Sequence, residues 1–117
     1  MKTVEQGAAD FLPLTPAVFH ILLAVADRDR HGLGIMRDVE ERTDGAVVLG
    51  PGTLYGTIKR MLKSALIEAA EERPAPDADD PRRRYYRITM LGRSVAESEA
   101  KRLAQLLGIA RAKKVYR

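Results

Sequence analysis

The order of the hydrophobic patterns along the chain constrains its fold more than any other feature. Apolar residues recur with a helical spacing near residues 15–27, 32–45 and 52–64. Two short segments, residues 66–72 and 83–89, are interpreted as strands, and the stretch between them holds three prolines and three aspartates. A helical pattern returns after Thr89. This order predicts a mainly α fold with a small β-hairpin (α+β), namely a winged helix-turn-helix followed by a long C-terminal helix.

The chain is expected to divide into three parts. Residues 1–13 are a weakly helical lead-in, residues 14–89 form the winged helix-turn-helix, and residues 90–117 form the last helix. Thr15 before Pro16, and Thr89 before the last helix, are typical N-caps. The last helix carries a partly heptad-like apolar stripe, which predicts dimerisation through it. The stripe consists of Leu91, Val95, Leu103, Leu106, Leu107 and Ala110.

Composition excludes several classes of function. The chain has no cysteine, which excludes disulfides, thiolate metal sites and a cysteine nucleophile. Its histidines are His20, in an apolar stretch and better explained by packing, and His31, which resembles a helix-start residue. No nucleophile or phosphate-loop motif is present, so we expect neither an enzyme nor a metal or cofactor site. Without a signal-like or membrane-spanning segment, the sequence indicates a soluble cytoplasmic protein.

The charges of the chain are unevenly distributed. Residues 1–58 contain 5 Lys and Arg against 8 Asp and Glu, whereas residues 59–117 contain 15 against 8. A basic half fits binding to a polyanion, and a solvated basic surface without a partner fits equally well. The charge distribution alone therefore does not decide between them.

The predicted third helix has an unusual polar side. Its core-facing stripe, Leu54, Ile58, Met61, Leu62 and Ala65, covers an arc of roughly 100°. The remaining residues are small, polar or basic, and no acidic residue occurs between Gly50 and Leu66. A solvated helix face usually mixes both signs of charge, because opposite charges one turn apart stabilise it. The polar side therefore favours DNA. It consists of Thr53, Tyr55, Gly56, Thr57, Lys59, Arg60 and Lys63.

Small residues begin this helix, as entry into a major groove requires. Gly50, Pro51 and Gly52 allow the backbone to approach base edges or a phosphate. Thr53 and Thr57 are expected to touch bases. The row Tyr55, Lys59 and Lys63 is expected to follow a phosphate strand, with Arg60 beside it. The alternative is that Gly-Pro-Gly is only a turn and Tyr55 a packing residue.

A second basic cluster, Arg82, Arg83 and Arg84, begins the return strand of the hairpin. Three consecutive arginines in a strand cannot all face a core, and a wing beside a recognition helix lies over the DNA backbone or minor groove. The competing interpretation is that they neutralise Asp77, Asp79 and Asp80 in the hairpin.

Taken in order, these segments resemble the PadR family of winged-helix transcriptional regulators. The matching pieces are LTPAVFHILLAV, HGLGI, GPGTLYGTIKRMLKSALI, and RRYYRIT with the following LG, over roughly residues 14–93. The chain departs from many members in having Leu33 where they have tyrosine, an acidic wing tip and a single C-terminal helix.

The resemblance implies a homodimer, formed through the C-terminal helix, that binds double-stranded DNA at a palindromic promoter site, usually as a repressor. The matching DNA-contact positions are Thr53, Tyr55, Lys59 and Arg84, and Tyr85 and Tyr86 match a pair of wing aromatics of which at least one packs. A small-molecule effector is left open. The alternative function is a winged helix that binds another protein and no specific DNA.

Overall fold

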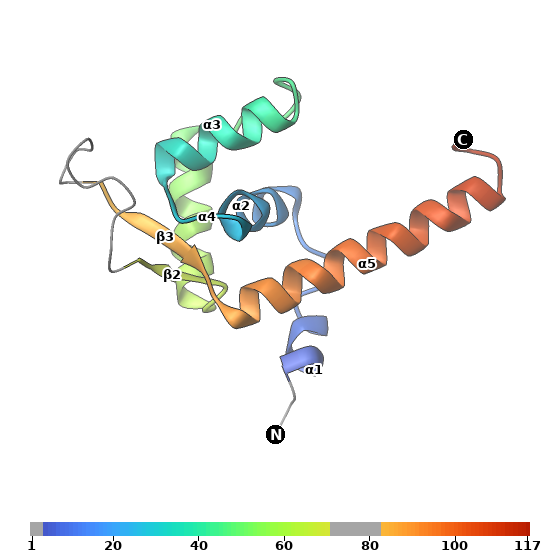
Figure 1. Ribbon diagram of the computed structural model, residues 1–117, viewed down its shortest axis with the longest axis horizontal. Helices are drawn as coiled ribbons and strands as arrows, with labels where there is room; N and C mark the ends of the chain where they lie inside the picture. Colours follow the sequence, from blue (N-terminus) through green and yellow to red (C-terminus); the bar gives the residue numbers. More distant parts are fainter. Residues whose placement is uncertain (1–3, 71–82) are drawn as a thin grey trace.

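The computed structural model describes residues 4–70 and 83–117, with side chains from residue 7 onward. It is mostly helical with a small three-stranded sheet, which confirms the predicted fold class (Figure 1). The elements are α1 (Val4–Ala9), α2 (Pro16–Ala26), β1 (Arg30–His31), α3 (Gly32–Arg42), α4 (Pro51–Lys63), β2 (Ile67–Ala69), β3 (Tyr85–Ile88) and α5 (Met90–Ala112). No helix in the described part of the chain is both long and apolar enough to cross a membrane.

The helices begin where their capping residues predict. Thr15 accepts a hydrogen bond from the Val18 N–H, and Thr89 accepts one from the Gly92 N–H at 2.9 Å. His31 caps α3 through Nδ1, which accepts from the Gly34 N–H at 3.0 Å. Such caps satisfy N–H groups that have no partner within the first turn. They explain why the helix starts follow from local sequence.

The sheet holds a strand that the hydrophobic pattern did not predict. The order is β1-β3-β2, with both pairs antiparallel, so the wing strand β3 lies in the middle. Arg30 pairs with Tyr86 and His31 with Tyr85 in the β1–β3 register. The Arg30 guanidinium donates to the Ala24 carbonyl at 2.6 Å and lies 3.3 Å from Asp38. Arg30 therefore links β1 to the end of α2 and to α3, and the pairing of β1 with β3 holds these elements against the wing.

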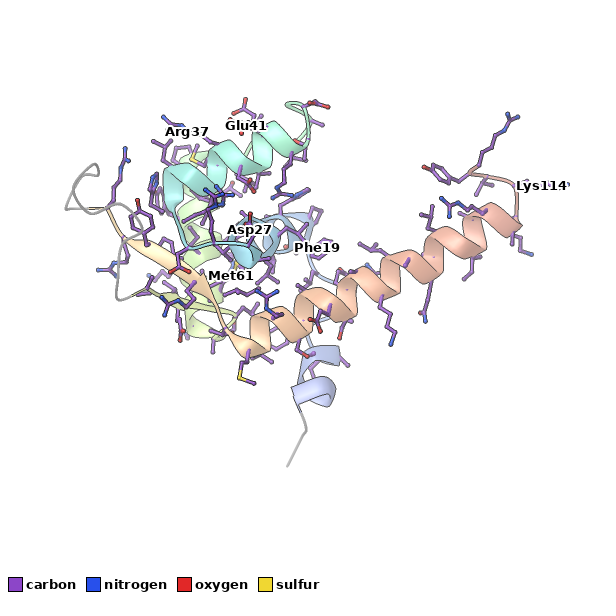
Figure 2. The ribbon with its side chains drawn as sticks, in the orientation of Figure 1. Phe19, Asp27, Arg37, Glu41, Met61 and Lys114 are labelled. Carbon is purple, nitrogen blue, oxygen red and sulfur yellow. The ribbon has the colours of Figure 1, made fainter. Side chains whose placement is uncertain are left out.

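The core lies between α2, α3, α4, the sheet and the first half of α5. Its fully buried side chains include Ile21 and Leu22 of α2, Ile35 of α3 and Leu54 and Ile58 of α4. Figure 2 shows Arg37 and Glu41 on the outer side of α3, whereas Met61 is only 1% exposed. The predicted core stripe of α4 is confirmed except at Ala65. That residue is exposed and lies beyond the helix end with a φ of 62°, so it belongs to the turn before β2.

Helix α5 has two unlike halves. Its first half packs into the fold, and Gly92, Val95 and Glu99 are buried there. Helix α1 also packs against α5, and Ala8 belongs to the same core. The second half extends away from the other elements, and Lys114 lies near its far end (Figures 1 and 2). The leucines of this half are exposed, with Leu103 at 41%, Leu106 at 50% and Leu107 at 37%.

Two of the residues expected at a dimer interface belong to the core instead. Val95 is 0% exposed within the single chain, and the half-buried Leu91 packs against the same core. Both positions fit the heptad-like spacing, but they lie in the half of α5 that packs into the core. Ala110, the last residue expected at the interface, is half-buried. Ile109 is 57% exposed on the same half of α5, and it was not predicted as an interface residue because it lies outside the heptad-like spacing.

Candidate nucleic-acid interface

The exposed side of α4 is basic and free of acidic side chains. Lys59, Arg60 and Lys63 are all exposed, as are Thr53 and Tyr55 near the start of the helix. The buried residues Leu54, Ile58 and Met61 hold the opposite side against the core. This face therefore presents positive charge to solvent from a helix whose orientation is fixed by packing.

The first turn of α4 is open to a large partner. Gly50 is the N-cap and supplies no side-chain acceptor to the N–H groups of this turn. A Cβ added at Gly50 or at Gly52 would meet no heavy atom within 4 Å. Backbone N–H groups at a helix start are well suited to a phosphate oxygen when nothing covers them.

Thr57 does not belong to the exposed face, which corrects the expectation that it touches bases. The side chain is 1% exposed, and its hydroxyl donates to the Thr53 carbonyl at 2.7 Å. The Arg60 guanidinium also donates to the Thr57 hydroxyl at 3.2 Å. Helix α4 packs against α2, α3 and β2, so its buried side is wider than a 100° arc and includes this position.

Tyr55 combines packing with exposure. The residue is 50% exposed, yet its ring lies so close to Gly32 that a Cβ there would come within 2.5 Å of the Tyr55 hydroxyl. Gly32 therefore leaves room for the tyrosine ring between α3 and α4. The tyrosine thus takes part in the packing of α3 against α4 and also belongs to the exposed face of α4.

The wing contributes two described arginines. Arg83 and Arg84 are exposed, whereas Tyr85 and Tyr86 are buried at 9% and 7%. Burial raises the pKa of the Tyr86 hydroxyl, and the nearby Arg84 charge partly opposes that rise. The third arginine of the cluster, Arg82, and the acidic residues Asp77, Asp79 and Asp80 lie outside the described residues. The alternative interpretation, in which those aspartates neutralise the arginines, therefore also lies outside the described residues.

A cleft lies where the wing, α3 and α4 meet. Its volume is about 310 Å³, and its lining comes from the end of β1, the start of α3, Tyr55 of α4 and the wing. The residues that line it are His31, Gly32, Leu33, Tyr55, Arg83, Arg84 and Tyr86. The structure thus brings Tyr55 together with the wing arginines, while Lys59, Arg60 and Lys63 continue along α4 away from the cleft.

His31 was predicted only to start a helix, and it also reaches the cleft. Its Nδ1 caps α3, and its Nε2 lies 3.4 Å from the Arg83 guanidinium. The ring stands edge-on to Tyr85, with centroids 5.2 Å apart. The sequence indicated only that His31 stands at the start of a helix. The second role depends on the β1–β3 pairing, which the hydrophobic pattern did not reveal.

Comparisons with known proteins give a consistent result. A model of the transcriptional regulator PadR-like family matches residues 21–98. An uncharacterised protein of Lysinibacillus sphaericus is 31% identical over 86 residues, which cover 74% of this chain and 76% of that protein. An uncharacterised 37.1 kDa protein in a transposon of Streptomyces fradiae is 34% identical over 88 residues, but the match spans only 23% of it.

The fold also matches solved structures. The crystal structure of a PadR family transcription regulator from Clostridium difficile superposes with a TM-score of 0.70, covering 84% of this chain and 97% of that one. The sequence identity is 23%, so this likeness concerns the fold.

Proposed function

Because this chain belongs to the PadR-like family of transcriptional regulators, we propose that it is a repressor that binds a palindromic promoter site as a homodimer. The observation that carries the proposal is the exposed, acid-free basic face of α4 beside the wing arginines. A lysine- and arginine-rich face on one element is the electrostatic footprint of a DNA-binding surface.

The proposed mode of binding follows from the shape of this face. Helix α4 enters the major groove with its open first turn leading, so that Thr53 is nearest to base edges. Tyr55, Lys59 and Lys63 follow the phosphate backbone along one flank, and Arg60 lies beside them. The wing carries Arg83 and Arg84, with Arg82 next along the chain, to the adjacent backbone or minor groove.

Dimerisation is assigned to the second half of α5. Leu103, Leu106 and Leu107 are exposed on a helix that extends away from the fold, and neighbouring apolar residues would bury them in a second copy. We therefore propose that the boundary between the DNA-binding part and the dimerisation part of the chain lies near Arg102 instead of at residue 90. Two copies related by a twofold axis would place two α4 helices about 34 Å apart, one turn of DNA.

The alternative is a winged helix that binds another protein. An acid-free recognition helix aligned with a basic wing favours DNA over that alternative, because a protein-binding helix gains nothing from excluding acidic side chains. Competition between the protein's own upstream DNA and a shuffled duplex of the same composition distinguishes the two functions.

The first prediction concerns Lys59. Fluorescence-anisotropy titrations of Lys59→Gln over a salt series should show weaker binding to specific and shuffled duplexes alike. The slope of log K against log salt should fall in magnitude by about 1.8, or 0.9 for each of the two phosphate contacts that the homodimer loses. The matched control is Lys101→Gln, which removes the same charge from an exposed position on α5. An unchanged affinity and slope for Lys59→Gln would contradict the placement of α4 on DNA.

A further inference from the structure

Arg60 is exposed, and its side chain is held in one direction by a buried neighbour on the same helix. The guanidinium nitrogen Nη2 donates a hydrogen bond to the Thr57 hydroxyl at 3.2 Å. That hydroxyl is itself fixed, because it donates to the Thr53 carbonyl at 2.7 Å and the residue is only 1% exposed. A hydroxyl can donate one hydrogen bond and accept another, so the two bonds are compatible. The buried threonine therefore orients the arginine.

The guanidinium of Arg60 is turned back toward the start of α4. Its other terminal nitrogen, Nη1, would lie 3.8 Å from a Cβ added at Gly56, one turn nearer the helix start. Counting about 100° per residue, Thr53 and Arg60 lie within about 60° of Gly56 around the helix, and Lys59 lies on the other side of that glycine. The charge is therefore placed near Thr53, the residue proposed to be nearest to base edges, and not along the flank that Lys59 occupies.

The hydrogen bond to Thr57 leaves the arginine able to bind two acceptors at once. A guanidinium has two edges that each present a pair of N–H groups, and Nη2 contributes one hydrogen to each edge. The bond to Thr57 uses one of these hydrogens, so one complete edge remains. In the major groove, guanine presents two neighbouring acceptors, O6 and N7, and an arginine edge that binds both is the commonest specific contact.

We propose that Arg60 binds a guanine base in each half-site, and that Thr57 is the residue that positions it. The inference rests on the proposed function and adds a determinant of sequence specificity to it, since phosphate contacts carry no sequence information directly. An arginine that is already oriented loses less conformational freedom on binding than a mobile one, which favours its use at a base. A phosphate oxygen pair would satisfy the same edge, so the experiment must separate base from phosphate.

The first experiment measures the preference for guanine with the full chain. Selection from a library of random duplexes identifies the site that the wild-type protein prefers. Anisotropy titrations then compare this site with duplexes in which one guanine at a time is replaced by 7-deazaguanine, which pairs normally but lacks the N7 acceptor. One guanine in each half-site should weaken wild-type binding by about tenfold or more, and its replacement should not affect Arg60→Gln, which has already lost the contact. The control Lys59→Gln should keep the full dependence on that guanine.

The second experiment tests the positioning role of Thr57. Thr57→Val keeps the branched shape of the side chain and removes the hydroxyl that accepts from Arg60. The preference for guanine over 7-deazaguanine should fall by about threefold, and Thr57→Ser, which keeps a hydroxyl, should restore it. In the Arg60→Gln background, Thr57→Val should cause no further change. The preference is a ratio of two constants measured on the same protein, so a loss of stability alone would not alter it.

The remaining outcomes separate the possible failures. If the wild-type protein selects no common sequence from the library, the proposed function itself fails. If it selects a site but Arg60→Gln weakens binding to all duplexes alike, as expected for Lys59→Gln, the arginine contacts a phosphate and only the present inference fails. A site at which no guanine depends on Arg60 would overturn the inference in the same way. An unchanged preference in Thr57→Val would overturn the role of the threonine.

Discussion

Glu99 is the buried carboxylate that ties the two ends of the chain together. It is 2% exposed, accepts a hydrogen bond from the Leu14 N–H at 2.7 Å and pairs with Arg102 one turn later on α5. The hydrogen bond from Arg102 lowers the pKa of Glu99, burial raises it, and the Leu14 N–H and the Arg102 charge lower it further, so that the net shift is downward. The carboxylate therefore favours the folded state in its ionised form.

The sign of the pH dependence follows from this shift. Because the folded-state pKa lies below the ordinary value of 4.5, the unfolded chain takes up a proton first as the pH falls. The contribution of Glu99 to stability is therefore complete above pH 4.5 and declines below it. Urea unfolding should show that Glu99→Gln lowers the free energy of unfolding at pH 7 by about 1–3 kcal/mol, and that this difference shrinks below pH 4.5.

The matched control for Glu99 is Glu97→Gln. Glu97 is exposed two residues earlier on the same helix, so the same change of charge should alter stability by less than about 0.5 kcal/mol. A constant difference between wild type and Glu99→Gln from pH 7 to pH 3 would contradict the assigned role of the carboxylate.

Gly92 is a second residue whose identity is fixed by its surroundings. A Cβ at this position would come within 2.0 Å of the Leu66 carbonyl oxygen, where α5 crosses the chain ahead of β2. Backbone atoms cannot move aside as the end of a flexible side chain can. Gly92→Ala should therefore lower the free energy of unfolding by about 3 kcal/mol or more, although alanine is the better helix former.

Gly56→Ala, in the middle of α4, provides the comparison for Gly92. A Cβ there would meet only the end of the Arg60 side chain, at 3.8 Å. It should stabilise the fold by about 0.5–1 kcal/mol through helix propensity alone. Chemical denaturation of both variants measures the two effects, and a Gly92→Ala protein as stable as wild type would show that α5 can shift away from Leu66.

At the scale of elements, the parts that could be predicted from sequence are those determined locally. Thr15, His31 and Thr89 each cap the helix that follows, so the helix starts required no knowledge of the tertiary structure. The buried side of α4 followed from periodicity for the same reason. The order of elements and the family resemblance then sufficed for the fold class.

The parts that could not be predicted depend on contacts between distant segments. Strand β1 has two residues, too few for a periodic signal, and exists because β3 pairs with it. Thr57 is buried because three elements pack around α4, and Val95 because the first half of α5 packs into the core. The second role of His31 has the same origin, since only the β1–β3 pairing brings its ring to the wing.

At the scale of the whole molecule, α5 has to serve two purposes at once. Residues up to Glu99 complete the core of a single chain, and the exposed leucines beyond Arg102 are left without a partner in the described part of the chain. Removing the helix from Arg93 onward would therefore destroy the core together with any dimer interface. A point substitution on the exposed half tests dimerisation without that loss.

Leu106→Glu is the appropriate substitution, because Leu106 is 50% exposed and far from the core. In a monomer the new carboxylate stays in water and stability is unaffected, whereas in a dimer it would be buried among leucines without a partner. Analytical ultracentrifugation at micromolar concentration should show a dimer for wild type and a monomer for Leu106→Glu. Gln105→Glu adds the same charge at an exposed polar position and should remain dimeric.

The same variant should reveal how the dimer contributes to DNA binding. A dimer engages two half-sites, and the second contact is made at a high effective concentration, so its loss should weaken binding to the full site about 100-fold or more. The remaining monomer would keep its own phosphate contacts, and its salt slope should fall to about half of the dimer's. If Leu106→Glu remains dimeric, the exposed leucines of α5 cover some other surface, and the twofold arrangement of the α4 helices must be formed elsewhere on the molecule.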